Sequence, residues 1–424
     1  MAGAKRRRNH RLFYKIILLA SFYLHNSKNC CTFAADFSLE TTMTTIKNPF
    51  IIKGLIPDAY FCDRVKETEI LTNHIHNGRN VVLTAPRRIG KTGLIAHCFQ
   101  NAEWEKDYYV FFIDILETSS LRDLTFALGK QIFETLKPRS KQMMDLFVQT
   151  VRSISGEFGY DPLSGMPKFN LTLGAIQNPE YTLSEIFDYI NKADKRCLIA
   201  IDEFQQIVHY PEKNIEAILR THIQHCSNAD FIFAGSERHI LEEMFNLPSR
   251  PFYASTVNMS LEAISVDIYA EFVIRLFREF NKQIDTDSVE YVYRLFDGNT
   301  YCMQKVMNVA FAMTPNADVC SYTIIEHAIE DILSDNERNY QNRLSLLTPK
   351  PKELLIAIAK EGKASRITSG QFIKKHHLLS SSSVQSAIKQ LLSEDWITYS
   401  SNEQGQKQYM LSDPFFTIWL QRHF

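Results

Sequence analysis

The chain has 424 residues and an almost balanced charge, with 47 Lys and Arg against 48 Asp and Glu. Its length suffices for two or three domains that each bury a core. Hydrophobic residues make up 45% of the chain beside 15 Gly and 14 Pro, which excludes a disordered or fibrous protein. The net charge of −1 excludes a strong field for nucleic acid over the whole molecule. The eight cysteines show no Cys-x-x-Cys spacing, so we expect a reducing, cytoplasmic location.

The N-terminal segment, residues 1–47, differs from the rest of the chain. Basic residues at 5–8 precede an apolar run from Ile16 to Leu24, an order that imitates a signal peptide. This run of nine residues is too short to span a membrane, and we expect no membrane association. We favour a mis-assigned start or a dispensable leader over a working export signal, and expect the segment to be disordered or loosely helical.

A phosphate-binding loop is predicted between an apolar run at 80–83 and a helix-prone run at 94–99. When a loop joins a strand to a helix in this way, its backbone N–H groups and the N-terminus of the helix can bind a polyphosphate. The usual first glycine is an alanine here, which fits if its φ is negative. The alternative is a chance basic turn. The predicted ATP-binding residues are Ala85, Pro86, Arg87, Arg88, Ile89, Gly90, Lys91, Thr92 and Gly93.

Two of these residues have further predicted roles. Lys91 can reach the β- and γ-phosphates, and the Thr92 hydroxyl can ligate Mg²⁺. A second Mg²⁺ ligand is expected at Asp202, which follows the apolar run Cys197–Ile201. The next residue, Glu203, is predicted to polarise the attacking water as general base. The alternative is an ordinary strand end followed by a solvated acidic turn.

The next strand is predicted at Phe231–Ala234, and its polar end places Ser236 where a γ-phosphate sensor would lie, unless Gly-Ser is only a turn. Apolar strands alternating with helical patterns predict a parallel sheet covered by helices, an α/β fold. Between the predicted strands at 109–115 and 197–201, an insertion at 154–177 contains an alternating run, Phe169–Leu173. We expect surface decoration there rather than a partner contact.

After the sheet, residues 266–343 have a helical pattern, with an apolar stripe predicted at Ile268, Phe272, Leu276 and Phe280. Residues 297–300, Asp-Gly-Asn-Thr, are predicted to end one helix and begin another.

The last 79 residues have the pattern of a winged helix, with helices at 352–361, 369–377 and 382–393, strands at 396–399 and 408–411, and a closing helix from 413. DNA recognition would fall on Gln385, Lys389 and Gln390 of the third helix. That helix ends in Glu394 and Asp395, which would repel phosphates. DNA contact therefore competes with interdomain packing or a protein partner.

Four segments carry a resemblance to a known family. They are the Pro-Arg-Arg-x-Gly-Lys-Thr form at 86–92, the acidic strand end at 201–205, the segment 60–64 with Glu67, and the loop 249–253. From about Asn48 to the C-terminus, the chain resembles prokaryotic AAA+ ATPases of the archaeal-ATPase type, relatives of the STAND NTPases and of the origin-recognition ATPases.

The resemblance implies a P-loop NTPase parallel sheet with a helical lid and a C-terminal winged-helix domain. The expected domains are a P-loop ATPase domain at 48–260, the lid at 261–345 and the winged helix at 346–424. The segment 60–64 would pack near the adenine. Arg250 would act on the γ-phosphate of a neighbouring subunit, which implies a nucleotide-dependent homo-oligomer; the alternative is a salt bridge. Tyr301 occupies the place where many such lids carry an arginine.

Two functions therefore compete. The first is a Mg²⁺-dependent ATPase that acts as a conformational switch, with Lys91, Thr92, Asp202 and Glu203 carrying the phosphoryl chemistry. The second is a nucleotide-gated regulator that binds DNA or protein with little or no hydrolysis.

Overall fold

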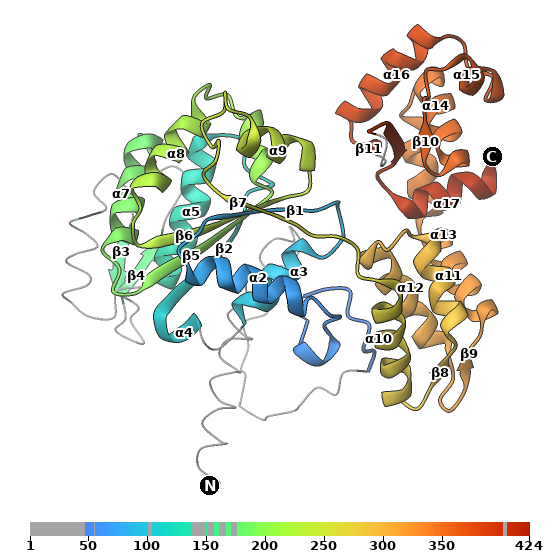
Figure 1. Cartoon of the computed structure of the whole chain (residues 1–424), viewed down its shortest axis with the longest axis horizontal. Coiled ribbons are helices and arrows are strands. Elements are labelled where there is room, and N and C mark those ends of the chain that lie inside the picture. The colour runs from blue at the N-terminus through green and yellow to red at the C-terminus, as the bar shows by residue number, and fades with distance from the viewer. Residues whose placement is uncertain are drawn as a thin grey trace. The chain divides into compact units, whose positions relative to one another are not determined.

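The computed structural model describes residues 47–54, 56–100, 104–136, 150, 157–160, 167–170, 176–401 and 405–424 (Figure 1). Residues 1–46 of the predicted leader and most of the insertion at 154–177 lie outside them. The chain forms two compact units, of which the first contains Lys53–Ile264 and the second contains Ser265–Phe424 together with the segment that ends at Ile52. The few residues before Lys53 thus pack with the helical part of the chain, although the sheet domain was expected to begin at residue 48.

The first unit is built on a five-stranded parallel sheet with the strand order β2-β5-β6-β1-β7. Its strands are β1 (Val81–Thr84), β2 (Tyr108–Asp114), β5 (Arg196–Asp202), β6 (Ala229–Gly235) and β7 (Val257–Ser260). Four of them were predicted within one or two residues. The edge strand β7 was missed, because only four residues with one buried side chain carry too weak a pattern.

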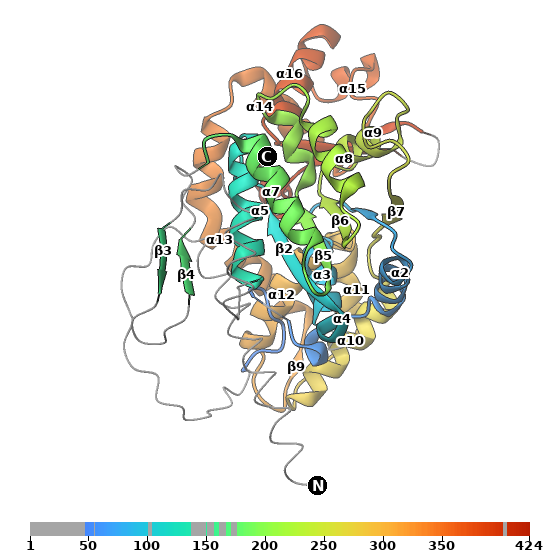
Figure 2. The same ribbon diagram turned by 90° about the vertical axis from the view of Figure 1, so that its left-hand side faces the viewer.

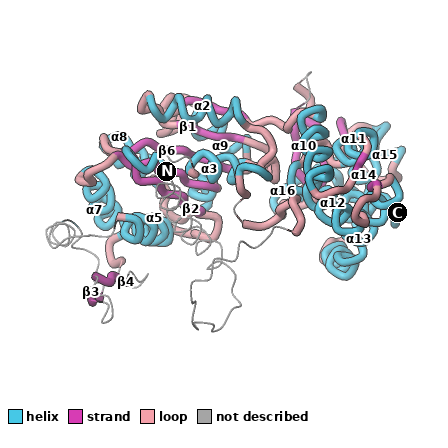
Figure 3. The backbone as a smooth tube through the Cα atoms, turned by 90° about the horizontal axis from the view of Figure 1, so that it is seen from below, coloured by secondary structure: helices cyan, strands magenta, loops and turns pink. Residues whose placement is uncertain are grey.

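Helices cover both faces of this sheet, as the parallel strands require. Successive residues of β5 point to opposite faces: Ile199 joins the core under α5, α7 and α8, while Leu198 and Ala200 join the core under α2 and α3. Figures 2 and 3 show α5 and α7 side by side on one face, with α2 on the other. The helices of this unit are η1 (Asp58–Tyr60), α2 (Val65–His76), α3 (Lys91–Phe99), α4 (Trp104–Asp107), α5 (Leu121–Thr135), α7 (Pro179–Asn191), η3 (Phe204–His209), α8 (Ile215–His225) and α9 (Arg238–Asn246).

The predicted insertion contains a small antiparallel pair, β3 (Glu157–Tyr160) with β4 (Pro167–Asn170). A strand was expected at Phe169–Leu173, and its first two residues lie in β4. Residues 171–173 lie outside the described part of the chain.

The second unit begins with helices around an aromatic core. The fully buried Phe50 packs its ring 5.5 Å from Phe277 and 5.8 Å from Phe311. The helix break at 297–300 is confirmed, because Asn299 caps the following helix by accepting a hydrogen bond from the Cys302 N–H. The elements of this part are α10 (Val266–Glu279), β8 (Gln283–Ile284), α11 (Thr286–Leu295), α12 (Thr300–Met313), β9 (Val319–Cys320) and α13 (Tyr322–Ser345).

The predicted stripe of α10 is partly wrong. Phe272 and Leu276 are buried as expected, but Ile268 is 42% exposed. A strict spacing of four residues drifts around a helix of 3.6 residues per turn, so the buried face alternates steps of three and four. Tyr269, Val273 and Phe277 complete that face.

The C-terminal part has the predicted winged-helix order, with three antiparallel strands in the order β10-β12-β11. Its closing helix packs against α13, where the Phe416 and Trp419 rings lie 5.2 and 5.7 Å from the Tyr340 ring. Its elements are α14 (Pro349–Glu361), β10 (Ala364–Ser365), α15 (Gly370–Lys375), α16 (Ser381–Ser393), β11 (Ile397–Ser401), β12 (Lys407–Leu411) and α17 (Pro414–His423).

None of the helices in the described ranges is long and apolar enough to cross a bilayer.

Candidate functional site

The phosphate loop turns between β1 and α3 through two residues with positive φ. Arg88 has a φ of 66° and Gly90 a φ of 99°, and the second value lies in a region that L side chains rarely adopt. Ala85 is buried and keeps a negative φ, so the missing first glycine is accommodated as expected. Helix α3 begins at Lys91, directly after this turn, so its first N–H groups belong to the loop.

The start of α3 meets the end of β5. The Lys91 Nζ lies 3.3 Å from Asp202 Oδ1 and 3.7 Å from Glu203 Oε1. The Thr92 Oγ1 donates a hydrogen bond of 2.6 Å to Asp202 Oδ2. Both Lys91 and Asp202 are buried, with 7% and 3% exposure, so these charges are close and poorly screened. The two residues predicted as magnesium ligands therefore lie in direct contact.

Glu203 is held in one orientation. It has a φ of 55°, which turns the chain sharply after β5 into the 3₁₀ helix η3. Its Oε2 accepts hydrogen bonds from Gln205 Nε2 at 2.6 Å, from Ser236 Oγ at 2.8 Å and from Ser236 N at 3.2 Å. Burial opposes ionisation, but Lys91 and these donors outweigh it and lower the pKa of Glu203. Glu203 is therefore an ionised carboxylate.

Ser236 joins the phosphate loop to the acidic strand end. Besides its two hydrogen bonds to Glu203, its Oγ accepts one from Arg87 Nε at 3.3 Å. The neighbouring strands β5 and β6 end side by side, which is why a residue 33 positions further along the chain reaches Glu203. The structure thus brings together the predicted residues Arg87, Lys91, Thr92, Asp202, Glu203 and Ser236.

A further carboxylate at this edge was missed. Asp114 ends β2 and is paired in register with Asp202 on β5. Burial raises the pKa of Asp114, and the charges of Asp202 and Glu203 raise it further, against the hydrogen bond from the Leu116 N–H. The signal was present, because Asp114 follows an apolar run just as Asp202 does.

The segment before α2 anchors the loop. Arg64 is 3% exposed, and its guanidinium donates to Glu67 Oε1 at 2.5 Å and to the Ile89 carbonyl at 3.3 Å. Phe61 stacks on His97 of α3 with a centroid distance of 4.2 Å. The segment predicted to pack near the adenine therefore contacts both the loop and the helix that follows it.

Arg250 is paired within its own chain. Its guanidinium makes a short two-point contact with Glu216 of α8, and its Nη1 lies 3.2 Å from Glu243 of α9. Burial raises the pKa of Glu216, although Arg250 lowers it. This geometry favours the salt bridge left open as the alternative to a role in a neighbouring subunit.

Residues of the second unit that were singled out have the following places. Tyr301 lies in the first turn of α12 and is 38% exposed. On α16, Gln385 and Lys389 are exposed, while Gln390 is half-buried and donates to Glu394 at 3.0 Å.

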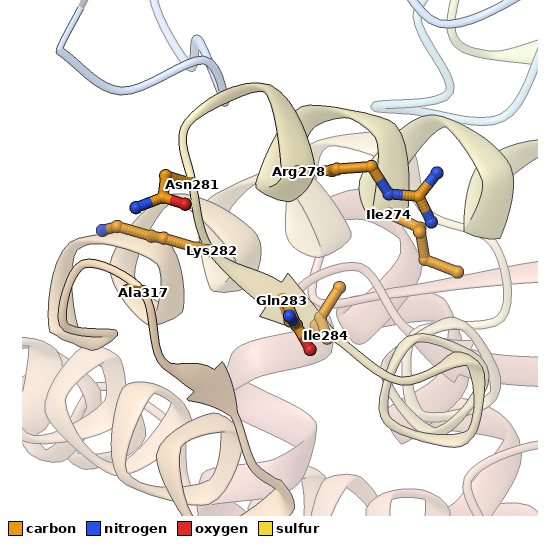
Figure 4. A pocket seen from close by; sticks show the side chains of 7 residues that line it. All are labelled: Ile274, Arg278, Asn281, Lys282, Gln283, Ile284 and Ala317. Carbon is orange, nitrogen blue, oxygen red and sulfur yellow. The ribbon is translucent and has the colours of Figure 1, made fainter.

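A pocket of about 420 Å³ also lies in the second unit (Figure 4). Lys282 is one of its lining residues; its ammonium donates to the Phe311 carbonyl at 2.6 Å, and burial lowers the pKa of Lys282. None of the predicted site residues lines it. The lining residues are Ile274, Arg278, Asn281, Lys282, Gln283, Ile284 and Ala317.

A glycine-turned loop between a parallel strand and a helix, facing carboxylates at the next strand end, defines a P-loop nucleotide-binding protein. Residues 61–306 match the family described as an ATPase domain predominantly from Archaea, and residues 338–422 match a probable winged helix domain. The chain belongs to this ATPase family and binds ATP.

A curated relative also carries an ATP-binding description. An uncharacterized ATP-binding protein of Methanocaldococcus jannaschii is 28% identical over 163 residues, which are 36% of this chain and 45% of that protein. The match thus spans less than half of that relative's length.

Two solved structures share the fold at low identity. A Walker-type ATPase of Pyrococcus abyssi has a TM-score of 0.57 at 18% identity, covering 88% of this chain and 99% of its own. The ORC2 protein of Aeropyrum pernix, in ADPNP and ADP complexes, has a TM-score of 0.55 at 14% identity, covering 88% and 95%.

Proposed function

We propose that this protein is a cytoplasmic, Mg²⁺-dependent ATPase that acts as a conformational switch. The observation that carries the proposal is the convergence of Lys91, Thr92 and Asp202 at the edge of the sheet, with Glu203 held beside Lys91. A buried lysine at a helix start suits a polyphosphate, and an ionised, oriented carboxylate next to it suits the activation of water.

Different residues of the site bind the phosphates and activate the water molecule. The N–H groups of residues 87–93 and the Lys91 ammonium bind the β- and γ-phosphates. Glu203 orients a water molecule against the γ-phosphate and accepts its proton. The Ser236 hydroxyl contacts both Glu203 and Arg87 of the phosphate loop. Ser236 would therefore transmit a movement of the loop on γ-phosphate binding or release to Glu203.

Magnesium fits the donors present. Thr92 Oγ1 and Asp202 Oδ2 are hard oxygen ligands 2.6 Å apart, and Mg²⁺ uses few protein ligands beside water and phosphate oxygens. When bound, Mg²⁺ would neutralise charge on the phosphate oxygens.

The test is release of phosphate from Mg-ATP by the purified chain and by the Glu203→Gln variant. Loss of a positioned base costs about 10²–10⁴-fold in rate, while ATP affinity should stay within about threefold. Glu212→Gln, on the loop after η3, is the matched control and should keep full turnover. Full turnover by Glu203→Gln would remove Glu203 from the reaction.

The winged helix supports a second candidate, a nucleotide-gated regulator with little or no hydrolysis. Gln385 and Lys389 are exposed on α16, the helix that would enter a major groove, and Lys374 is exposed on α15. Two other basic side chains of this part, Lys375 and His376, both contact Glu361. The partner would be duplex DNA or a protein.

Titration of the purified chain with duplex DNA, in the presence of ATP and of ADP, distinguishes the two candidates. The regulator predicts nucleotide-dependent binding that weakens steeply with salt and weakens further in Lys389→Ala. Rapid phosphate release without any response to DNA supports the ATPase alone. Binding that is unaffected by nucleotide and by Lys389→Ala would reject DNA gating through α16.

A further inference from the structure

The Gln205 side chain lies under the acidic end of β5 and is almost fully withdrawn from water. It belongs to the first turn of η3 and is 2% exposed. Its Nε2 donates to Glu203 Oε2 at 2.6 Å, the shortest of the three hydrogen bonds on that oxygen. With Oε2 occupied by three donors, Oε1 is the carboxylate oxygen that faces the Lys91 ammonium, at 3.7 Å.

The other end of the same amide has no hydrogen-bond partner among the described residues. Gln205 Oε1 is buried and accepts no hydrogen bond. A buried acceptor left in this way costs stability, and an apolar side chain of the same length would avoid that cost. Packing alone therefore gives no reason for a glutamine here, whereas the hydrogen bond to Glu203 does.

A glycine on the next strand makes room for this amide. A Cβ at Gly235 would lie 2.0 Å from Gln205 Oε1, far inside contact distance, and also 2.8 Å from Leu241 Cδ1 and 3.1 Å from Gln205 Cδ. Gly235 ends β6 directly before Ser236, which supplies the other two donors to Glu203. The last residue of β6 and the residue after it thus act on one carboxylate: Ser236 donates to Glu203, and Gly235 leaves space for Gln205.

We propose that Gln205 is a positioning residue for hydrolysis: together with Ser236 it occupies Oε2 of Glu203, so that Oε1 is the atom presented to the water beside the γ-phosphate. This inference rests on the proposed function. Gln205 acts only through Glu203, so its loss should lower kcat and leave the KM for ATP unchanged.

The first experiment compares Gln205→Met with Gln206→Met. Gln206 is the next residue of η3, but its amide donates to the Thr118 carbonyl at 3.1 Å. We expect kcat for ATP to fall about tenfold in Gln205→Met at unchanged KM. Tm should change little, because the lost hydrogen bond to Glu203 is offset by removal of an unpartnered buried acceptor. Gln206→Met should keep kcat within about twofold. Equal kcat in the two variants, or a lower Tm that alone accounts for the loss in Gln205→Met, overturns the proposal.

Gly235→Ala crowds the same amide without replacing Gln205. Its methyl group would also meet Leu241, so Tm is measured beside kcat and KM. The added methyl group should displace the amide and lower kcat at unchanged KM. Unchanged kcat in Gly235→Ala would overturn the proposal, even if Gln205→Met failed to fold.

A double variant separates this inference from the proposed function. In the Glu203→Gln background, Gln205→Met should cause no further loss, because the carboxylate that it positions is gone. If the unchanged chain releases no phosphate from Mg-ATP, the proposed function fails. If Glu203→Gln leaves turnover intact, the role of Glu203 as base fails, and the positioning role of Gln205 fails with it. If Glu203→Gln abolishes turnover but Gln205→Met does not lower it, only the positioning role fails.

Discussion

The Thr92 hydroxyl donates a hydrogen bond of 2.6 Å to Asp202, although 110 residues separate the two in the sequence. Lys91 also contacts Asp202, at 3.3 Å, so two adjacent residues at the start of α3 bind the end of β5. These contacts make the loop and the acidic end of β5 parts of one site. Substitutions in either part should therefore change ATP affinity or turnover, whereas substitutions on distant surfaces should not.

Lys91→Ala should weaken ATP binding about 10- to 100-fold, because a charge-assisted contact contributes about 1.5–3 kcal/mol. Titration calorimetry with ATP measures this directly. Lys130→Ala, an exposed lysine on α5, is the control and should bind as the unchanged chain does. Equal affinities of the two variants would show that the loop is not the ATP site.

Gly90 and Gly93 should respond differently to replacement by alanine. Gly90→Ala forces a φ of 99° on an L side chain, which should destabilise the fold by about 1–2 kcal/mol and weaken ATP binding. Gly93 is helical, and an added Cβ would meet Phe61 at an ordinary 3.6 Å. Gly93→Ala should therefore be neutral or stabilising by up to about 1 kcal/mol. Chemical denaturation measures both, and a destabilised Gly93→Ala would contradict this account.

Arg64→Met should destabilise the phosphate loop by removing its contact with the segment before α2. It removes the bonds to Glu67 and to the Ile89 carbonyl, at a cost of about 2 kcal/mol, and should lower ATP affinity several-fold. Arg64→Lys should restore little, because a lysine lacks the forked donors. The exposed neighbour Lys66→Met provides the comparison in denaturation and calorimetry, and should match the unchanged chain.

Arg250→Ala distinguishes a salt bridge from an arginine that acts in another subunit. The contacts with Glu216 and Glu243 predict a loss of about 1–2 kcal/mol in stability, more than for Arg238→Ala, whose exposed pair with Glu242 contributes about 0.3–0.5 kcal/mol. A role in a homo-oligomer predicts instead that turnover per subunit rises with protein concentration and falls about 10³-fold or more in Arg250→Ala. Turnover that is independent of concentration and survives the substitution would leave Arg250 structural.

Much of the fold was predictable because local patterns carry it. Apolar runs marked four of the five parallel strands, and the break at 297–300 marked the start of α12. The stripe of α10 was misplaced at Ile268, since a pattern read four residues at a time ignores the rotation of the helix.

By itself, the sequence predicted a phosphate-binding loop at residues 85–93. It determined that Asp202 ends a buried strand directly before Glu203 and that a winged helix follows a helical region. These features depend on neighbours in the chain. Only the tertiary structure decided that Arg64 holds the loop, that Arg250 pairs with Glu216, and that Gln205 fits against Gly235. Such contacts join residues on different elements, and no periodicity records them, because the register of the sheet and the direction of each side chain exist only once the chain has folded.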